Sequence, residues 1–263
     1  MKNISIIDLR LPEKCDERLR DLGFTPLRIP KNPLYDSAVS AHPDIFVFIY
    51  HKYIFAKEPA YTLIKQMFGR EECFAQKKLI QISEDNQIKK YPQDCGLNFA
   101  VCGEHIIGNR KVAHECVQQL ALNENLKWID VRQAYAKCNI CIVSDNALIT
   151  EDAGIAKSCE NSGIDVLLLN THSVSIEKYK YGFIGGASSD IYFSEKNKRK
   201  EILFCGNITA HPEYERIEKF CLGYNVFPVS LFEEKLIDCG SIFLIREDKQ
   251  REENNFFDTY LII

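Results

Sequence analysis

The stretch Cys138-Asn-Ile-Cys-Ile-Val-Ser-Asp-Asn-Ala-Leu-Ile-Thr-Glu-Asp-Ala-Gly-Ile-Ala-Lys157, which continues to Gly163-Ile-Asp-Val-Leu-Leu-Leu169, decides the fold of this chain. An apolar run over 139–143 predicts a short strand, and Ser144-Asp-Asn146 is a turn by composition. Residues 147–150 then predict a returning strand. The first half of the stretch is therefore expected to form a tight hairpin.

The second half of the stretch predicts a helix and a third strand. Thr150 or Asp152 can cap a helix that runs to about residue 161, because a side-chain oxygen there can accept from free backbone amides. Gly163 stands just past its end, where a left-handed residue stops a helix at little cost. The apolar run 166–169 is typical of a strand buried on both faces of a sheet. The unit is thus strand, strand, helix, strand.

The same unit recurs along the whole chain. The first strands of its copies are expected to start near Asp44, Asn98, Asn139, Asp190 and Gly240, at intervals of 41 to 54 residues. The last copy has no helix after its strand 240–245. The N-terminal segments 4–9, 11–22 and 25–29 supply the missing parts, with either 259–263 or 4–9 as the returning strand.

Five such units predict one α/β domain built as a pseudo-fivefold propeller, closed by pairing of the N- and C-terminal segments. Circular closure removes exposed sheet edges. A stacked solenoid would need polar capping repeats at its ends, and an open α/β sheet also produces tandem units; the two-residue hairpins favour closure. The expected modules are 42–96, 97–134, 135–177, 178–236, and 237–263 together with 1–41.

Composition narrows the class of protein. The chain has 263 residues, is 46% hydrophobic and carries a formal net charge of -4, so it can bury a full core, and its acidic balance argues against a nucleic-acid partner. The basic run Lys196-Asn-Lys-Arg-Lys200 is interpreted as a solvated hairpin tip, with a polyanion contact as the alternative. No apolar run approaches the ~20 residues of a membrane helix, so a soluble, cytoplasmic protein without a membrane partner is expected.

The eleven cysteines are interpreted as free thiols. Cys138 and Cys141 form a Cys-x-x-Cys pair, but they lie in a predicted strand and would face opposite sides of it. A thioredoxin-type motif opens a helix, and a zinc knuckle needs a second pair. Buried thiols in a reducing compartment are therefore favoured, and no cofactor and no metal are predicted.

Several segments resemble the pentein fold, that of the guanidino-group-modifying enzymes, and in particular an uncharacterised family assigned to it. They are Tyr135-Ala-Lys-Cys138, Gly182-Phe-Ile-Gly-Gly-Ala-Ser188, His211-Pro-Glu-Tyr214 and Asp238-Cys-Gly-Ser-Ile242. In the enzymes a cysteine near the C-terminus attacks the guanidinium carbon, and Cys239 has the matching place. The resemblance thus implies a cysteine-dependent hydrolase or amidinotransferase-like enzyme, with Cys239 as nucleophile and His42 as candidate acid or base.

The chain departs from the enzymes at their other motifs. Their His-x-Asp motif corresponds to Gly185-Gly-Ala-Ser-Ser189, and their Glu-Gly-Gly-Asp motif to Ala136-Lys-Cys-Asn139. Their substrate-binding aspartate corresponds roughly to Leu97-Asn98. The alternative is therefore a non-catalytic pentein that binds a small ligand or a protein partner in its axial cavity.

In a closed radial fold, the residues that begin each module converge on one central cavity, where a ligand would lie. The expected ligand is a small polar molecule such as a guanidino compound. Local explanations stay open: Asp44 and His42 can organise a turn, Lys137 can reach solvent, and His211 can belong to a helix start. The predicted ligand-binding residues are Asp44, Asn98, Lys137, Cys138, Ser188, Ser189 and Asp238.

Overall fold

The computed structural model describes residues 3–84 and 87–246. These residues form five three-stranded sheets that share one topology. In each sheet, two antiparallel strands are joined by a third strand that runs parallel to the middle one and follows a helix. The strand–strand–helix–strand unit expected from the sequence is therefore present five times.

The elements have the following bounds. The strands are β1 (Asn3–Asp8), β2 (Phe24–Ile29), β3 (Val47–Tyr50), β4 (Tyr53–Ala56), β5 (Lys78–Gln81), β6 (Ala100–Cys102), β7 (His105–Gly108), β8 (Lys127–Asp130), β9 (Ile140–Ser144), β10 (Ala147–Thr150), β11 (Asp165–Leu168), β12 (Tyr192–Ser194), β13 (Arg199–Phe204), β14 (Val226–Ser230) and β15 (Phe243–Ile245). The α-helices are α1 (Glu13–Asp21), α2 (Pro43–Phe46), α3 (Ala60–Met67), α4 (Glu115–Asn123), α5 (Ala136–Asn139), α6 (Ala153–Glu160) and α7 (Tyr214–Gly223).

The sheet order also joins segments from near the two ends of the chain. β1 is the middle strand of its sheet, with β15 antiparallel on one side and β2 parallel on the other. The expected pairing of an N-terminal with a C-terminal segment is confirmed, with Ser5 opposite Leu244. The other strand considered for that role, 259–263, lies outside the described residues.

Two first strands are each preceded by a helical turn that the sequence pattern did not indicate. Pro43–Phe46 forms α2 before β3, and a proline at the first helical position is already set to helical geometry. Ala136–Asn139 forms α5 before β9, so Cys138 lies in a helical turn and the prediction that it belongs to a strand was wrong. These turns place the module starts at the centre of the molecule.

Two helices begin beside a histidine ring. α4 begins at Glu115, where the ring of the preceding His114 accepts from the backbone amide of Cys116. α7 begins at Tyr214 rather than at His211, whose ring accepts from the backbone amide of Glu213. In both places a histidine ring accepts a hydrogen bond from the backbone amide two residues further along the chain.

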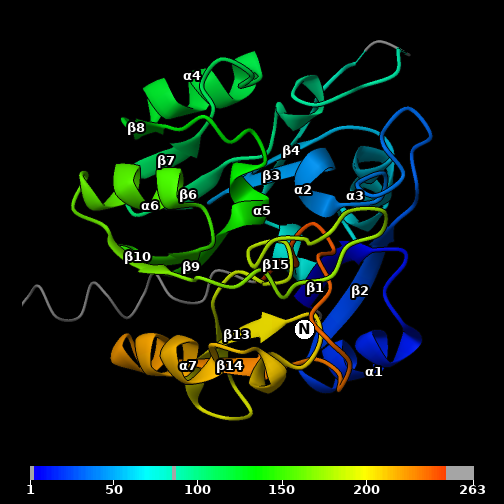
Figure 1. The fold of residues 1–263 in the computed structure, drawn as a ribbon. Coiled ribbons are helices and arrows are strands. Elements are labelled where there is room, and N and C mark those ends of the chain that lie inside the picture. Colours follow the sequence, from blue (N-terminus) through cyan, green and yellow to red (C-terminus); the bar gives the residue numbers. More distant parts are fainter. Residues whose placement is uncertain (1–2, 85–86, 247–263) are drawn as a thin grey trace, which may run out of the picture.

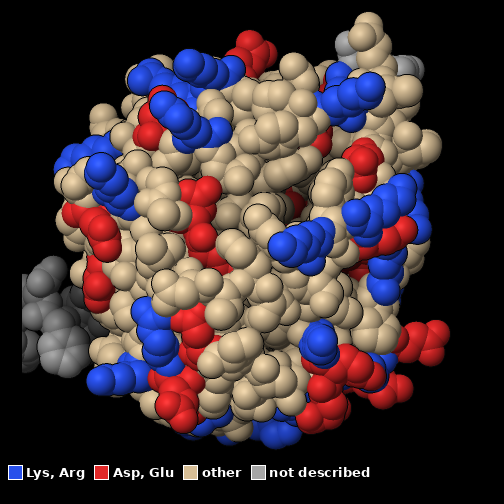
Figure 2. Space-filling view, in the orientation of Figure 1, with Lys and Arg blue, Asp and Glu red and all other residues tan. Residues whose placement is uncertain are grey.

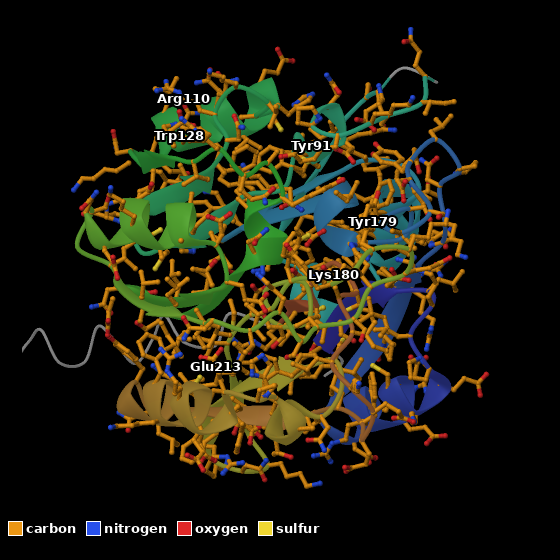
Figure 3. The ribbon with its side chains drawn as sticks, in the orientation of Figure 1. Tyr91, Arg110, Trp128, Tyr179, Lys180 and Glu213 are labelled. Carbon is orange, nitrogen blue, oxygen red and sulfur yellow. The ribbon has the colours of Figure 1, made fainter. Side chains whose placement is uncertain are left out.

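The core consists of five apolar clusters, each between two sheets. Four of them pack sheets that are consecutive in the chain, and the fifth packs the sheet of β13 against that of β1. Figure 1 shows α1, α3, α4, α6 and α7 at the periphery, with α2 and α5 nearer the centre. Figure 3 shows Trp128 beside Arg110 on one sheet, where the guanidinium carbon lies 5.5 Å from the ring centroid.

The surface carries mixed charge on the face seen in Figure 2. Lysine and arginine atoms alternate there with aspartate and glutamate atoms, and neither sign covers the face. Among the described residues, no helix is long and apolar enough to cross a bilayer.

Candidate functional site

The module starts meet in one buried region. All nine residues predicted for the site are buried. Hydrogen bonds join three of the starts directly, and the loop that carries Asp238 and Cys239 adds a fourth.

Asp44 joins the start of its own module to two others. The Cys138 thiol donates to Asp44 Oδ2 over 2.9 Å, and the Ser241 hydroxyl donates to the same oxygen over 3.2 Å. Oδ1 has no hydrogen-bond partner among the described residues. Burial raises the pKa of Asp44 to about 6. Burial also raises the pKa of the Cys138 thiol well above its ordinary value, and the negative charge of Asp44 raises it further. The pair therefore shares a proton that stays on sulfur.

Asn98 fixes the position of this pair. Its Oδ1 accepts from the backbone amide of Lys137 over 2.8 Å and from that of Cys138 over 3.4 Å, at the beginning of α5. Its Nδ2 donates to the Asp44 carbonyl over 3.2 Å. One amide side chain thus holds the turns α2 and α5 in a fixed relation.

His42 lies between two aspartates. Its Nε2 is 3.9 Å from Asp8 Oδ2, and its Nδ1 is 3.8 Å from Asp238 Oδ1. These separations exceed hydrogen-bond length, and neither ring nitrogen has a partner within the described part of the chain. Burial lowers the pKa of His42, although the two carboxylates act in the opposite direction. The ring is therefore a neutral imidazole in a fully buried place.

Asp238 is held by backbone amides from two segments. Its Oδ2 accepts from Phe183 N over 3.0 Å and its Oδ1 from Gly240 N over 3.1 Å. Burial raises its pKa to about 6. A Cβ on Gly186 would lie 2.0 Å from Oδ1, so the Gly-Gly pair in 182–188 serves close approach of chain segments.

Cys239 directs its thiol toward a different set of partners. Its sulfur lies 3.3 Å from the Gly186 carbonyl and 3.0 Å from the Cys205 sulfur. Burial raises its pKa. Within the described residues, no histidine or carboxylate is hydrogen-bonded to this sulfur. The thiol is therefore protonated at neutral pH.

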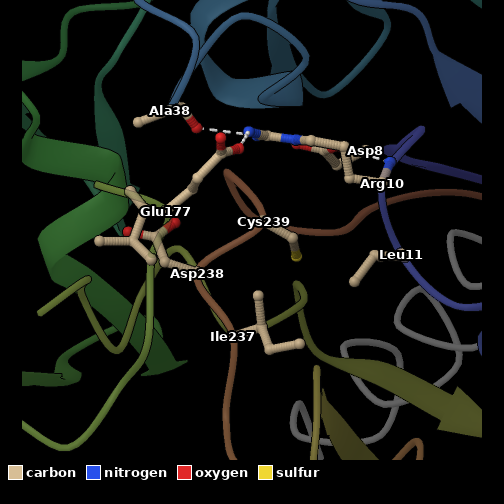
Figure 4. Close-up of a pocket in the computed structure, with 9 residues that line it drawn as sticks. Asp8, Arg10, Leu11, Ala38, Glu177, Ile237, Asp238 and Cys239 are labelled. Carbon is tan, nitrogen blue, oxygen red and sulfur yellow. Dashed lines mark hydrogen bonds and ion pairs between the residues drawn. The ribbon is translucent and has the colours of Figure 1, made fainter. Parts of the chain in front are cut away.

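A cavity of about 140 Å³ lies beside Cys239. Figure 4 shows the Arg10 guanidinium reaching across it to the Ala38 carbonyl, with Asp8 and Glu177 beside it. Both oxygens of Asp8 accept hydrogen bonds from Arg10: Oδ1 from Nε over 2.9 Å and Oδ2 from Nη2 over 2.5 Å. The lining residues are Asp8, Arg10, Leu11, Ala38, Ile176, Glu177, Ile237, Asp238 and Cys239.

The sequence analysis missed the three other charged residues of the lining. Asp8 ends the first strand of the chain and Arg10 follows it, whereas Glu177 comes from the connector between modules. The sequence could have indicated Asp8 and Arg10. β1 completes the module that contains Cys239, so the end of β1 is expected to lie near that cysteine. Glu177 gives no signal, since it follows no regular element.

Three predicted residues have local partners instead. The Lys137 ammonium lies 3.9 Å from Asp190 Oδ1 and 5.6 Å from the centroid of the Phe243 ring. Ser188 donates to the Gly185 carbonyl over 3.0 Å, and Ser189 donates to the Asp190 carbonyl over 2.7 Å. These contacts stabilise the backbone around the site, and a ligand contact for these side chains stays a prediction.

One group of potential metal donors is present among the described residues. One donor atom each from His42, Cys138 and Asp238 lies within 4.8 Å of the others. The sequence analysis predicted no metal, because the Cys138 and Cys141 pair lacks the second pair of a zinc knuckle.

Comparison with solved structures relates this fold to penteins. An agmatine deiminase from C. jejuni superposes with a TM-score of 0.51 at 9% identity, covering 88% of this chain and 86% of that one. SxtG, an amidinotransferase from Microseira wollei in the saxitoxin biosynthetic pathway, gives a TM-score of 0.49 at 12% identity, covering 90% of this chain and 80% of that one. No curated protein sequence is significantly similar to this chain.

The sequence itself matches one family model. The match extends over residues 6–243, which contain four of the five sheets in full, part of the fifth, and every residue predicted for the site. The chain is a pentein-fold protein that belongs to the Family of unknown function (DUF6873).

Proposed function

We propose that this chain binds a small guanidinium or amidinium compound in the cavity beside Cys239. The observation that carries the proposal is the charge of the lining: three carboxylates, from Asp8, Glu177 and Asp238, face one guanidinium. A planar cation that donates several hydrogen bonds suits such a surface, since charge-assisted bonds to carboxylates are among the strong ones. The small volume of the cavity restricts the ligand to a compound of few atoms.

The side chain of Arg10 supports this choice of ligand. Its guanidinium donates to both oxygens of the Asp8 carboxylate and also to the carbonyls of Ser37 and Ala38, each of the last two over 2.8 Å. Glu177 adds a contact of 3.4 Å. The wall of the cavity thus already holds one guanidinium, and the remaining carboxylates leave negative charge for a second.

The proposal includes a closed pseudo-fivefold ring around this site. Two observations support closure. β15 pairs with β1, and the five core clusters join each sheet to the next, with the last joined to the first. In such a ring the inner ends of the modules form a single axial site.

A second candidate is catalysis by Cys239, which is favoured by the position of its sulfur at the same cavity. The thiolate would form a bond to the guanidinium carbon, and the C–N bond to an amine would break as the amine takes a proton. Water would then replace sulfur and release a ureido product. His42, which lies 3.9 Å from Asp8 Oδ2 and 3.8 Å from Asp238 Oδ1, would be the acid or base of this reaction. Binding is the better-supported function, because the raised pKa of Cys239 opposes thiolate formation.

A thermal unfolding series tests binding. Methylguanidine is compared with methylurea, which has nearly the same shape and no charge. We expect methylguanidine at millimolar concentration to raise the Tm of the native chain and of Cys239→Ser, with Glu177→Gln losing most of the shift. Glu195→Gln on the distant hairpin is the charge-matched control and should behave as the native chain. Equal shifts with both compounds, or none, would contradict the proposal.

Labelling with iodoacetamide separates the two candidates. The binding function predicts that Cys239 reacts no faster than the other buried cysteines, measured by mass spectrometry of each cysteine peptide. Rapid, selective modification of Cys239, together with ureido product from a guanidino compound, would establish the catalytic candidate instead.

A further inference from the structure

The imidazole of His42 is fully buried, and its two nitrogens form no hydrogen bond with the surrounding described residues. Neither Nδ1 nor Nε2 has a hydrogen-bond partner in the described structure, and the side chain has no contact with solvent. A buried polar group without a partner destabilises the folded state, so native proteins satisfy nearly all of them with protein atoms, water or an ion. Asp44 Oδ1, which belongs to the same region, is unpartnered as well.

The donors around His42 have the separations of a metal site. Nδ1 of His42 and Oδ1 of Asp238 are 3.8 Å apart, and a donor atom of each of His42, Cys138 and Asp238 lies within 4.8 Å of the others. Tetrahedral zinc with bonds of about 2.0 to 2.3 Å places its ligands roughly 3.3 to 3.7 Å apart. Closing the cluster around an ion therefore needs side-chain movements of less than about 1 Å.

We propose that His42, Cys138 and Asp238 hold a divalent transition-metal ion of the zinc class. Imidazole and thiolate prefer such ions over magnesium or calcium, which prefer oxygen ligands. The three donors leave one tetrahedral position, which a water or the nearby carboxylate of Asp44 can fill. The site shares Asp238 with the lining of the cavity beside Cys239, whereas His42 and Cys138 do not line that cavity.

The charges and hydrogen bonds of the cluster fit this ion. Binding replaces the proton on the Cys138 sulfur, which is released to solvent, with a bond from sulfur to the metal. Two ligand charges, from the thiolate and the Asp238 carboxylate, then balance the two charges of the ion. Asn98 Nδ2 lies 3.5 Å from the sulfur, and Phe183 N holds the second oxygen of Asp238. Such outer contacts orient ligands at metal sites.

Metal titration of the native chain tests the site. The chain, purified without a metal-binding tag and stripped with a chelator, is titrated with Co²⁺ and in competition with Zn²⁺. We expect about one Co²⁺ per chain, a near-ultraviolet charge-transfer band from sulfur to cobalt, and displacement of Co²⁺ by Zn²⁺. Elemental analysis before stripping should find zinc at a similar ratio.

Variants locate the ligands. Cys138→Ser should abolish the charge-transfer band and weaken Co²⁺ binding at least tenfold, and His42→Gln should weaken it to the same degree. Cys141→Ser removes an equally buried thiol three residues away and should leave the band unchanged. Circular dichroism of each metal-free variant identifies any that is unfolded; should His42→Gln unfold, Cys138→Ser against Cys141→Ser decides alone. Absence of stoichiometric binding, or a band that survives Cys138→Ser, would overturn the proposal.

Discussion

At the scale of single residues, the site depends on how closely backbone segments approach each other. Gly186 is the tightest point. Its carbonyl accepts from the amides of Cys239 and Ser241, over 3.0 and 2.8 Å, while its missing side chain leaves room for the Asp238 carboxylate. This one glycine therefore positions the loop that carries both Asp238 and Cys239.

Replacing Gly186 by alanine should destabilise the fold. The new Cβ would meet Asp238 Oδ1 at 2.0 Å, and overpacking of this kind typically costs 1–3 kcal/mol. The control is Gly223→Ala at the end of α7, where a Cβ meets no atom within 4 Å and stability should stay equal or rise by up to about 1 kcal/mol. Urea unfolding measures both. Equal stabilities for the two variants would refute the close approach.

Glu151 should make the stability depend on pH. Its Oε2 accepts from Ile184 N, its Oε1 lies 3.8 Å from His172 Nδ1, and burial raises its pKa from 4.5 to about 7. The folded state therefore binds this proton more tightly than the unfolded state does, and the stabilisation is lost as pH rises from about 4.5 to about 7. Relative to Glu151→Gln, the native chain should lose on the order of 3 kcal/mol across that window. Parallel pH profiles of unfolding free energy for both chains would show that Glu151 titrates normally.

At the scale of elements, hydrophobic pattern and turn chemistry predict most of the strands and helices. β10 has the bounds expected from the sequence, and α6 begins after its expected cap Asp152. The turns α2 and α5 were not predictable from pattern, because Ile45-Phe46 and Asn139-Ile140 continue apolar runs that read as strand. The proline at the start of α2 is set to helical geometry, and α5 is held by Asn98, which accepts from the backbone amide of Lys137.

The cap of α6 is expected to contribute measurably to stability. Asp152 Oδ1 accepts from the amides of Gly154 and Ile155, over 2.7 and 2.9 Å. Asp152→Ala should therefore lower the free energy of unfolding by about 1 kcal/mol. Glu160→Ala at the opposite, exposed end of the same helix should change it by no more than about 0.5 kcal/mol. A loss in Glu160→Ala as large as that in Asp152→Ala would argue against the cap.

At the scale of the whole molecule, the sequence predicted the repeated unit. It predicted only part of the set of residues that form the site. Module starts bring His42, Asp44, Asn98 and Cys138 together, as topology alone implies. The lining of the cavity beside Cys239 could not be predicted from the module starts alone, because Asp8 and Arg10 reach it only through the pairing of β1 with β15. Glu177 lies there through a connector without regular structure, which no periodicity could place.

Shared clusters between the sheets predict that the molecule unfolds as one cooperative domain. Trp128 is the one tryptophan of the chain, so its fluorescence reports on the sheet of β6, β7 and β8, whereas far-ultraviolet circular dichroism reports on all five sheets. The two urea transitions should coincide in midpoint and slope. A separate transition seen by Trp128 would mean that this module unfolds independently.

Calorimetric titration with methylguanidine tests the central claim most directly. Native chain and Glu195→Gln should each bind one molecule, and neither should give heat with methylurea. Glu177→Gln should weaken the Kd about tenfold or more, since a hydrogen bond to a charged group contributes about 1.5–3 kcal/mol. Cys239→Ser should bind as the native chain does. Absence of methylguanidine binding, or a Kd unaffected by Glu177→Gln, would contradict a cation-binding site beside Cys239.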